Sequence, residues 1–210
     1  MALSGFFLLV FLLQHFIINL LSVISPDIFN QVSHFMGTNS LIQYLMQPIL
    51  LFGVLFHLIM GVYLDIKNRS SRPIKYAVDK QSENSSWMSR NMVITGVMVM
   101  LFLGLHLYDF WIPEIKIKFI EGDWTGLHNG EFRYWEELHH KFHDIVRVAI
   151  YCVAFVFLSL HLMHGFQSSF QSAGFNHNKY TPIIKKIGVL YAILIPAGFV
   201  FIAIFHYAIK

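Results

Sequence analysis

The stretch FVFLSLHLMHGFQ, residues 155–167, places two histidines inside an otherwise apolar run. An apolar run of this kind predicts a membrane-spanning helix, because about 20 apolar residues in a helix cross the ~30 Å hydrocarbon layer. Ionisable side chains inside such a helix are costly and are usually functional. The fold and the chemistry of the chain therefore both depend on what His161 and His164 contact.

The rest of the chain has the same character. Of its 210 residues, 56% are hydrophobic and only 13% are charged, whereas soluble domains carry about 25% charged residues. The composition predicts an all-α integral membrane bundle, a single domain over residues 1–210. Its five transmembrane helices are expected at about 3–24, 44–66, 91–112, 145–169 and 183–208. The first lacks a basic leading region and a cleavage site, so we expect a mature helix and not a signal peptide.

The positions of Lys and Arg predict the orientation of the helices. Loops 67–90 and 170–186 hold nine basic residues with three acidic residues nearby, while the opposite side has six basic and nine acidic residues. By the positive-inside rule the two basic loops are cytoplasmic, which puts the N-terminus inside and the C-terminus outside. The net charge of +3 therefore reflects topology, and no nucleic-acid partner is expected.

The histidines are unusually numerous and unusually placed. Twelve occur in the chain, and five lie inside predicted spans: His15, His57, His106, His161 and His164. At a rise of ~1.5 Å per residue, His57 and His161 lie at one depth, nearer the cytoplasm. His15 and His106 lie at a second depth, nearer the outside. A lone histidine of this kind is usually a core side chain bonded to a neighbouring helix, but four helices that each supply one favour a binding role.

Two imidazoles at one depth on separate helices suit the axial positions of a haem iron. Zinc usually takes four ligands, often with Cys or carboxylate among them. A proton relay would include acidic residues within the spans, but Asp65 and Asp109 sit near helix ends. Copper remains open on chemistry alone. The single cysteine, Cys152, excludes a Cys-ligated cluster, an internal disulfide and a C-x-x-C-H haem attachment.

Small residues distinguish His161 from His164. Gly61 follows His57 by four residues, and Gly165 follows His161 by the same spacing. A glycine at i+4 lies on the same helix face and lets a flat macrocycle or another helix approach closely. His164 lacks such a partner, so we predict that His161 binds iron and that His164 supports it.

Three long stretches then carry a family resemblance: GVLFHLIMGVYLDIKNRSSRPIKYA (53–77), SRNMVITGVMVMLFLGLHLYDFW (89–111) and LHLMHGFQSSFQSAGFNHNKYTPIIKKIGVLYAILIPAGF (160–199). With them the chain resembles the cytochrome b subunit of succinate dehydrogenase and fumarate reductase, in the five-helix branch with two haems b. The resemblance implies that His15 and His106 hold an outer haem and that His57 and His161 hold an inner one.

The same resemblance implies the setting of the protein. It implies a bacterial cytoplasmic membrane, menaquinone or another quinone as substrate, and two cytoplasmic partner subunits, a flavoprotein and an iron–sulfur protein. Electrons would pass between the iron–sulfur subunit and the quinone through the two haems. This chain itself has no dinucleotide glycine motif and no cysteine set for clusters.

Further residues are candidates for the haem propionates and the quinone. Trp87, Ser89 and Arg90 are expected near the inner haem, although Trp87 and Arg90 fit interfacial anchoring equally well; Tyr108 and Arg147 are expected near the outer haem. Some relatives carry a glutamate near the quinone, in the outer segment after the first helix. The corresponding segment SPDIFNQVSHFMGTNS (25–40) has none, which leaves Asp27 or His34.

Two questions stay open on the sequence. The outer stretch GEFRYWEELHHKFHD (130–144) contains His139, His140 and His143, and we interpret it as an amphipathic lead-in to the fourth span, because local spacing alone rarely makes a metal site. The alternatives for the whole chain are a haem b anchor of a hydrogenase or formate dehydrogenase, and a transporter lined with histidines. A transporter would be colourless, whereas a haem protein is red.

Overall fold

A computed structural model describes residues 1–70, 91–128 and 130–209 of the chain. In these ranges the protein is helical apart from one two-stranded hairpin, which confirms the predicted all-α class. Five helices are long and apolar enough to cross a membrane, namely Ala2–Ile24, Ile42–Asn68, Met92–Ile120, Ile145–Ser172 and Thr181–Ala208. All five predicted spans are therefore present as helices.

The elements of the described ranges run in chain order as follows: α1 (Ala2–Ile24), α2 (Pro26–Thr38), the π-helical segment η1 (Ile42–Met46), α3 (Gln47–Ser70), α6 (Met92–His106), the π-helical segment η2 (Leu107–Trp111), α7 (Ile112–Ile115), the π-helical segment η3 (Lys116–Ile120), β1 (Leu127–His128), β2 (Glu131–Phe132), α8 (Tyr134–Lys141), α9 (Ile145–Ser172) and α10 (Thr181–Ala208).

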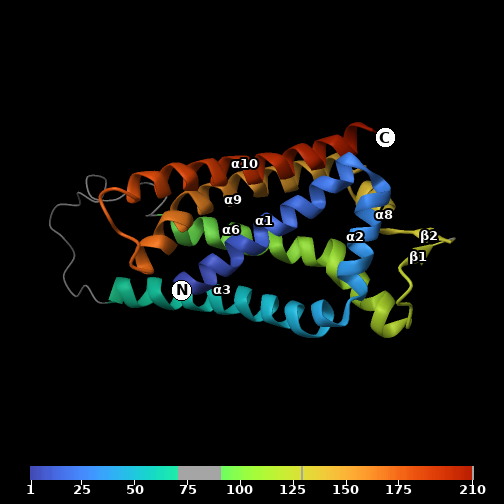
Figure 1. Cartoon of the computed structure of the whole chain (residues 1–210), viewed down its shortest axis with the longest axis horizontal. Helices are drawn as coiled ribbons and strands as arrows, with labels where there is room; N and C mark the ends of the chain where they lie inside the picture. The colour runs from blue at the N-terminus through green and yellow to red at the C-terminus, as the bar shows by residue number, and fades with distance from the viewer. Residues whose placement is uncertain (71–90, 129, 210) are drawn as a thin grey trace.

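The long helices lie side by side in one elongated bundle (Figure 1). Helix α9 packs against α10, α6 and α1, while α3 packs against α1 and, less extensively, α6. One end of the bundle carries the α9–α10 connection, and the other carries α2, α8, the hairpin and the C-terminus (Figure 1). Successive spans therefore alternate in direction, as the charge pattern requires.

Two segments are more helical than the sequence suggested. Residues 26–38, expected as part of a short outer segment, form α2, whose N-cap Ser25 accepts a hydrogen bond from the Ile28 amide with Pro26 at the first helical position. The third span, expected to end near residue 112, continues to Ile120. Pro113 would normally end or kink a helix, but here π-helical segments on both sides of it carry the chain onward.

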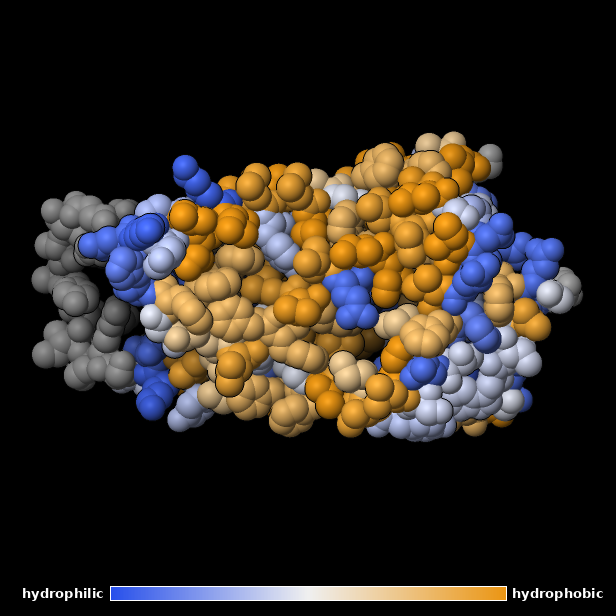
Figure 2. Space-filling view, in the orientation of Figure 1, coloured by the Kyte–Doolittle hydropathy of each residue, from blue (hydrophilic) through white to orange (hydrophobic). Residues whose placement is uncertain are grey.

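The side chains are arranged as a bilayer protein requires. On the face shown in Figure 2, apolar residues cover most of the middle of the bundle and hydrophilic residues gather toward both ends, with one hydrophilic group near the centre. The aromatic core lies between α9, α10 and α1 at the C-terminal end and includes Tyr151, Phe155 and Phe199. In α3, by contrast, none of the apolar 18-residue window is buried, so its side chains remain available to lipid or to a bound group.

Candidate functional site

The first pair of histidines joins α1 to α6. The ring centres of His15 and His106 lie 5.7 Å apart with the ring planes at 83°. The side-chain amide of Asn19 donates to the His15 carbonyl (2.8 Å) and lies 3.3 Å from His15 Nδ1. His106 Nδ1 is buried and has no hydrogen-bond partner among the described residues.

Aromatic side chains surround this pair. Phe11 stacks on His15 at 5.5 Å and Phe199 lies 5.8 Å from it. Phe102 and Phe110 lie 5.9 and 5.2 Å from His106. The surroundings are apolar, as a porphyrin requires, and an apolar groove of about 550 Å³ runs beside them between α6 and α9, with Phe102 and Leu105 in its wall.

The second pair joins α3 to α9. The ring centres of His57 and His161 lie 6.4 Å apart with the planes at 70°. Ser4 Oγ lies 3.1 Å from His57 Nδ1 and donates its own proton to the Met1 carbonyl at 2.8 Å. Thr95 Oγ1 lies 3.3 Å from His161 Nδ1 and donates to the Met92 carbonyl at 2.9 Å.

These hydroxyl contacts assign the tautomers of the second pair. A hydroxyl has one proton, and Ser4 and Thr95 each give theirs to the backbone. Each hydroxyl oxygen therefore accepts from the imidazole, so His57 and His161 carry their protons on Nδ1 and keep the Nε2 lone pairs free. A histidine that ligates a metal through one ring nitrogen usually donates a hydrogen bond from the other.

The ring separations fit one metal ion between each pair. A bond of about 2 Å from metal to imidazole nitrogen places the centres of two opposed rings about 6 Å apart, and the two observed separations are 5.7 and 6.4 Å. Among the described residues no group of three or more His, Cys, Asp or Glu side chains is arranged to hold a metal ion. The donors present thus suit a centre that supplies its own equatorial ligands, as haem does, and do not suit tetrahedral zinc.

The glycines of the two H-x-x-x-G stretches are only loosely packed. A Cβ atom on Gly61 would meet only the terminal methyl group of Met1 at 3.4 Å, and one on Gly165 only that of Met92, also at 3.4 Å. Neither glycine lies under the backbone of another helix. His164 is partly buried on α9, one turn beyond His161 and outside both pairs.

Of the five residues predicted for the haem propionates, the structure describes Tyr108 and Arg147. Tyr108 lies in η2 and is 62% exposed. Arg147 forms an ion pair with Asp109, whose other oxygen accepts from the Tyr151 hydroxyl at 2.8 Å. Any propionate would therefore share this guanidinium with a buried carboxylate. Trp87, Ser89 and Arg90 lie outside the described residues.

The two residues predicted for the quinone lie on α2 but differ in environment. Asp27 is exposed in the first turn of the helix. The ring of His34 lies 4.5 Å from Phe132 of the hairpin, and its Nδ1 is buried with no hydrogen-bond partner in the part of the chain that the structure describes.

Sequence reasoning missed a polar network at the same end of the bundle. Glu114 forms ion pairs with Lys118 (2.6 Å) and Arg133 (2.5 Å), and Arg133 also pairs with Glu137 (2.8 Å). The Lys118 side chain is only 1% exposed and donates to the Gly37 carbonyl. Burial raises the pKa of the adjacent Tyr134 to about 12. The spacing of Glu114 and Lys118 at i,i+4 was the available signal, but only on a helix that continues past residue 112.

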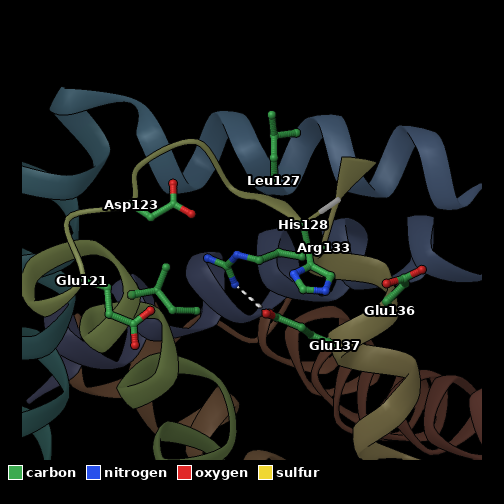
Figure 3. A pocket seen from close by; sticks show the side chains of 8 residues that line it. Glu121, Asp123, Leu127, His128, Arg133, Glu136 and Glu137 are labelled. Carbon is green, nitrogen blue, oxygen red and sulfur yellow. Dashed lines mark hydrogen bonds and ion pairs between the residues drawn. The ribbon is translucent and has the colours of Figure 1, made fainter. Parts of the chain in front are cut away.

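A polar pocket of about 340 Å³ opens beside this network (Figure 3). Carboxylates dominate its wall, with Arg133 reaching in to Glu137 (Figure 3). Hydrogen bonds from Thr125 lower the pKa of Asp123. The pocket is built from η3, the hairpin and α8, none of which carries a histidine of the two pairs; its lining residues are Ile117, Glu121, Asp123, Leu127, His128, Arg133, Glu136 and Glu137.

Five membrane-length apolar helices with paired histidines between them define the class: an all-helical, multi-pass membrane protein. Within that class the chain is similar to the succinate dehydrogenase cytochrome b558 subunit of Bacillus subtilis (strain 168), with 22% identity over 101 residues. This stretch is 48% of this chain and 46% of the relative, so the chain spans about half the length of the curated relative it matches. No family model and no solved structure matches the chain. The expected resemblance is thus confirmed as a distant similarity.

Proposed function

We propose that this chain is the dihaem cytochrome b membrane-anchor subunit of a succinate:quinone oxidoreductase. The observation that carries the proposal is that four histidines, one from each of α1, α3, α6 and α9, meet as two pairs whose ring separations suit one iron each. The distant similarity to a succinate dehydrogenase cytochrome b558 subunit supports the same function.

In this proposal His57 and His161 bind the inner haem through Nε2, while Ser4 and Thr95 hold the two rings by accepting from Nδ1. His15 and His106 bind the outer haem, with Asn19 against the His15 ring. A haem with both axial positions filled by protein supplies one-electron transfer and offers no open site for oxygen or substrate. Gly61 and Gly165, one turn from these two histidines, contact only flexible methionine methyl groups.

The proposal includes a direction across the membrane. The basic loops face the cytoplasm, where the flavoprotein and iron–sulfur subunits dock, and menaquinone reacts near the outer pair, with Asp27 or His34 as its polar contact. An electron that crosses the whole bilayer exchanges about 2.3 kcal/mol per 100 mV of membrane potential. The unpartnered Nδ1 of His34 supports a ligand contact at this end.

Haem content per chain tests the proposal. Wild-type protein is expected to hold two haems b, measured as the pyridine haemochrome against protein concentration. His161→Ala should lose the inner haem and keep the outer one, and His106→Ala should do the reverse, because each variant removes one of two axial ligands. His164→Ala is the matched control on α9 and should keep both haems.

A His161→Ala variant that retains two haems would disprove the ligand assignment. The identity of the complex is tested separately, by purifying the tagged chain from its native membrane. A succinate-oxidising flavoprotein and an iron–sulfur protein are expected to co-purify, whereas hydrogenase or formate dehydrogenase subunits would indicate the alternative anchor.

A further inference from the structure

A second group of histidines lies at the end of the bundle that holds α2 and α8. His139 Nε2 and His143 Nε2 lie 3.0 Å apart. The ring of His139 stacks on Trp135 with centres 4.7 Å apart, and Trp135 is itself fixed by a hydrogen bond from its Nε1 to the Ser22 carbonyl (2.9 Å). One nitrogen of the pair is therefore held in place by packing, while His143 is exposed.

A hydrogen bond with the Ser22 hydroxyl group fixes the tautomer of His206, whose ring lies behind His139. Ser22 Oγ donates to the Asn19 carbonyl at 2.6 Å and lies 2.9 Å from His206 Nε2. Since the hydroxyl has one proton, it accepts from His206 Nε2–H, which leaves His206 Nδ1 as an acceptor. His206 is 0% exposed, and its Nδ1 is buried without a partner among the described residues.

His139 packs against His206 without a hydrogen bond to it. The two ring centres lie 5.6 Å apart, and His139 Nδ1, like His206 Nδ1, is buried without a partner among the described residues. The His139 ring is held by Trp135 and His206, and its Nε2 is the nitrogen that lies next to His143.

We propose that His139 and His143 form a binding site for one divalent transition-metal ion of the kind that prefers imidazole, such as Zn²⁺ or Cu²⁺. Bonds of about 2.0–2.1 Å to nitrogens 3.0 Å apart subtend about 95° at the ion, which is ordinary cis coordination. Trp135 and His206 pack against the His139 ring and hold it in place. The contact between the two Nε2 atoms holds one proton, which moves to Nδ1 of its own ring when the metal takes its place.

Two protein ligands are fewer than the four of a structural zinc site or the three of a catalytic one. Water therefore fills the remaining positions, and the ion exchanges with solvent. The ring centre of His140 lies 5.9 Å from that of His143, but the three histidines are not arranged as a three-ligand site. This site is independent of the haem pairs, which use other histidines.

Zinc titration of the full chain tests the site. The protein is purified in detergent with a tag that contains no histidine, and Zn²⁺ is titrated in competition with a chromophoric chelator at neutral pH. His143→Ala is expected to weaken the strongest Zn²⁺ site at least about tenfold, because it removes one of the two protein ligands. His128→Ala, an exposed histidine of the hairpin at the same end, should bind as wild type does.

A second readout identifies the donor atoms. The electron paramagnetic resonance spectrum of bound Cu²⁺ should show two equivalent nitrogens in wild type and one in His143→Ala. The proposal is overturned if wild type and His143→Ala bind Zn²⁺ equally, or if His128→Ala loses as much affinity as His143→Ala. In either case the 3.0 Å contact is a plain hydrogen bond.

Discussion

Asp109 is a buried carboxylate that joins the third and fourth spans through an ion pair. It lies in η2, three residues after His106, and its side chain is fully buried. Arg147 from α9 neutralises it, and Tyr151 donates to it at 2.8 Å. The same Tyr151 ring lies 6.5 Å from His106. A charged pair thus fixes α6 to α9 directly beside the outer histidine pair, at a position that sequence analysis had placed near a helix end.

Asp109→Asn should destabilise the protein, because Arg147 would keep a largely buried charge without its counter-ion. Removal of one partner of a buried ion pair costs about 3 kcal/mol. Denaturant unfolding in detergent, followed by circular dichroism, measures the loss. Glu131→Gln, which alters an exposed carboxylate of the hairpin, is the control and should change little.

The double variant Asp109→Asn with Arg147→Met tests the same ion pair by removing both partners together. It removes both charges and should recover part of the lost stability. A single variant as stable as wild type would show that the pair contributes nothing to folding.

The segment from α7 to α8 owes its structure to ion pairs more than to apolar burial. Lys118 on η3 and Arg133 at the start of α8 both reach Glu114 on α7. Lys118 also binds the Gly37 carbonyl at the end of α2. These contacts join α2, α7, η3 and the start of α8 through one carboxylate. They add to the buried core residue Leu138 of α8 and to the hydrogen bonds of Trp135 with Asn30 and Ser22.

Two carboxylates of this network give a matched comparison. Glu114 is 22% exposed and holds two cations, whereas Glu137 is 44% exposed and holds one. Glu114→Gln should cost about 3 kcal/mol because the buried Lys118 loses its counter-ion, and Glu137→Gln about 1 kcal/mol or less because water screens that pair. Equal losses in thermal unfolding would contradict the network as described.

The whole bundle is asymmetric in its packing. The apolar window of α10 is 39% buried, whereas that of α3 is 0% buried. Helix α10 carries no histidine of the two pairs and packs against α9 and α1. Helix α3 carries His57 but has few protein neighbours, so a bound group between the helices would stabilise its position. If the proposed inner haem binds between His57 and His161, its loss should loosen α3 before any other span.

The predicted orientation of the bundle is testable with introduced cysteines in a Cys152→Ser background. A membrane-impermeant maleimide applied to intact spheroplasts should label Glu131→Cys, because the hairpin lies on the outer side in the predicted topology. Asn176→Cys, in the exposed α9–α10 connection, should be labelled only after permeabilisation. The reverse pattern would place the basic loops outside and refute the proposed docking face for the partner subunits.

Much of this architecture follows from local sequence. Five long apolar blocks predict five helices, because a bilayer leaves the backbone no partner except itself. His15, His57, His106 and His161 were identifiable because histidine is costly in hydrocarbon, and their pairing followed from helix rise and alternating direction. The helix α2 and the extension to Ile120 were missed, since amphipathic surface helices and π-helical segments around a proline lack a strong apolar signal.

The sequence by itself determined the number of spans, their alternation and the two depths at which histidines occur, because these depend on composition and on a rise that is constant along a helix. Only the tertiary structure decided which side chains of different helices contact each other. Ser4 with His57, Thr95 with His161, Arg147 with Asp109 and His206 behind His139 all join residues distant in the chain. Such contacts depend on the rotation of each helix about its axis, which packing sets and hydropathy does not.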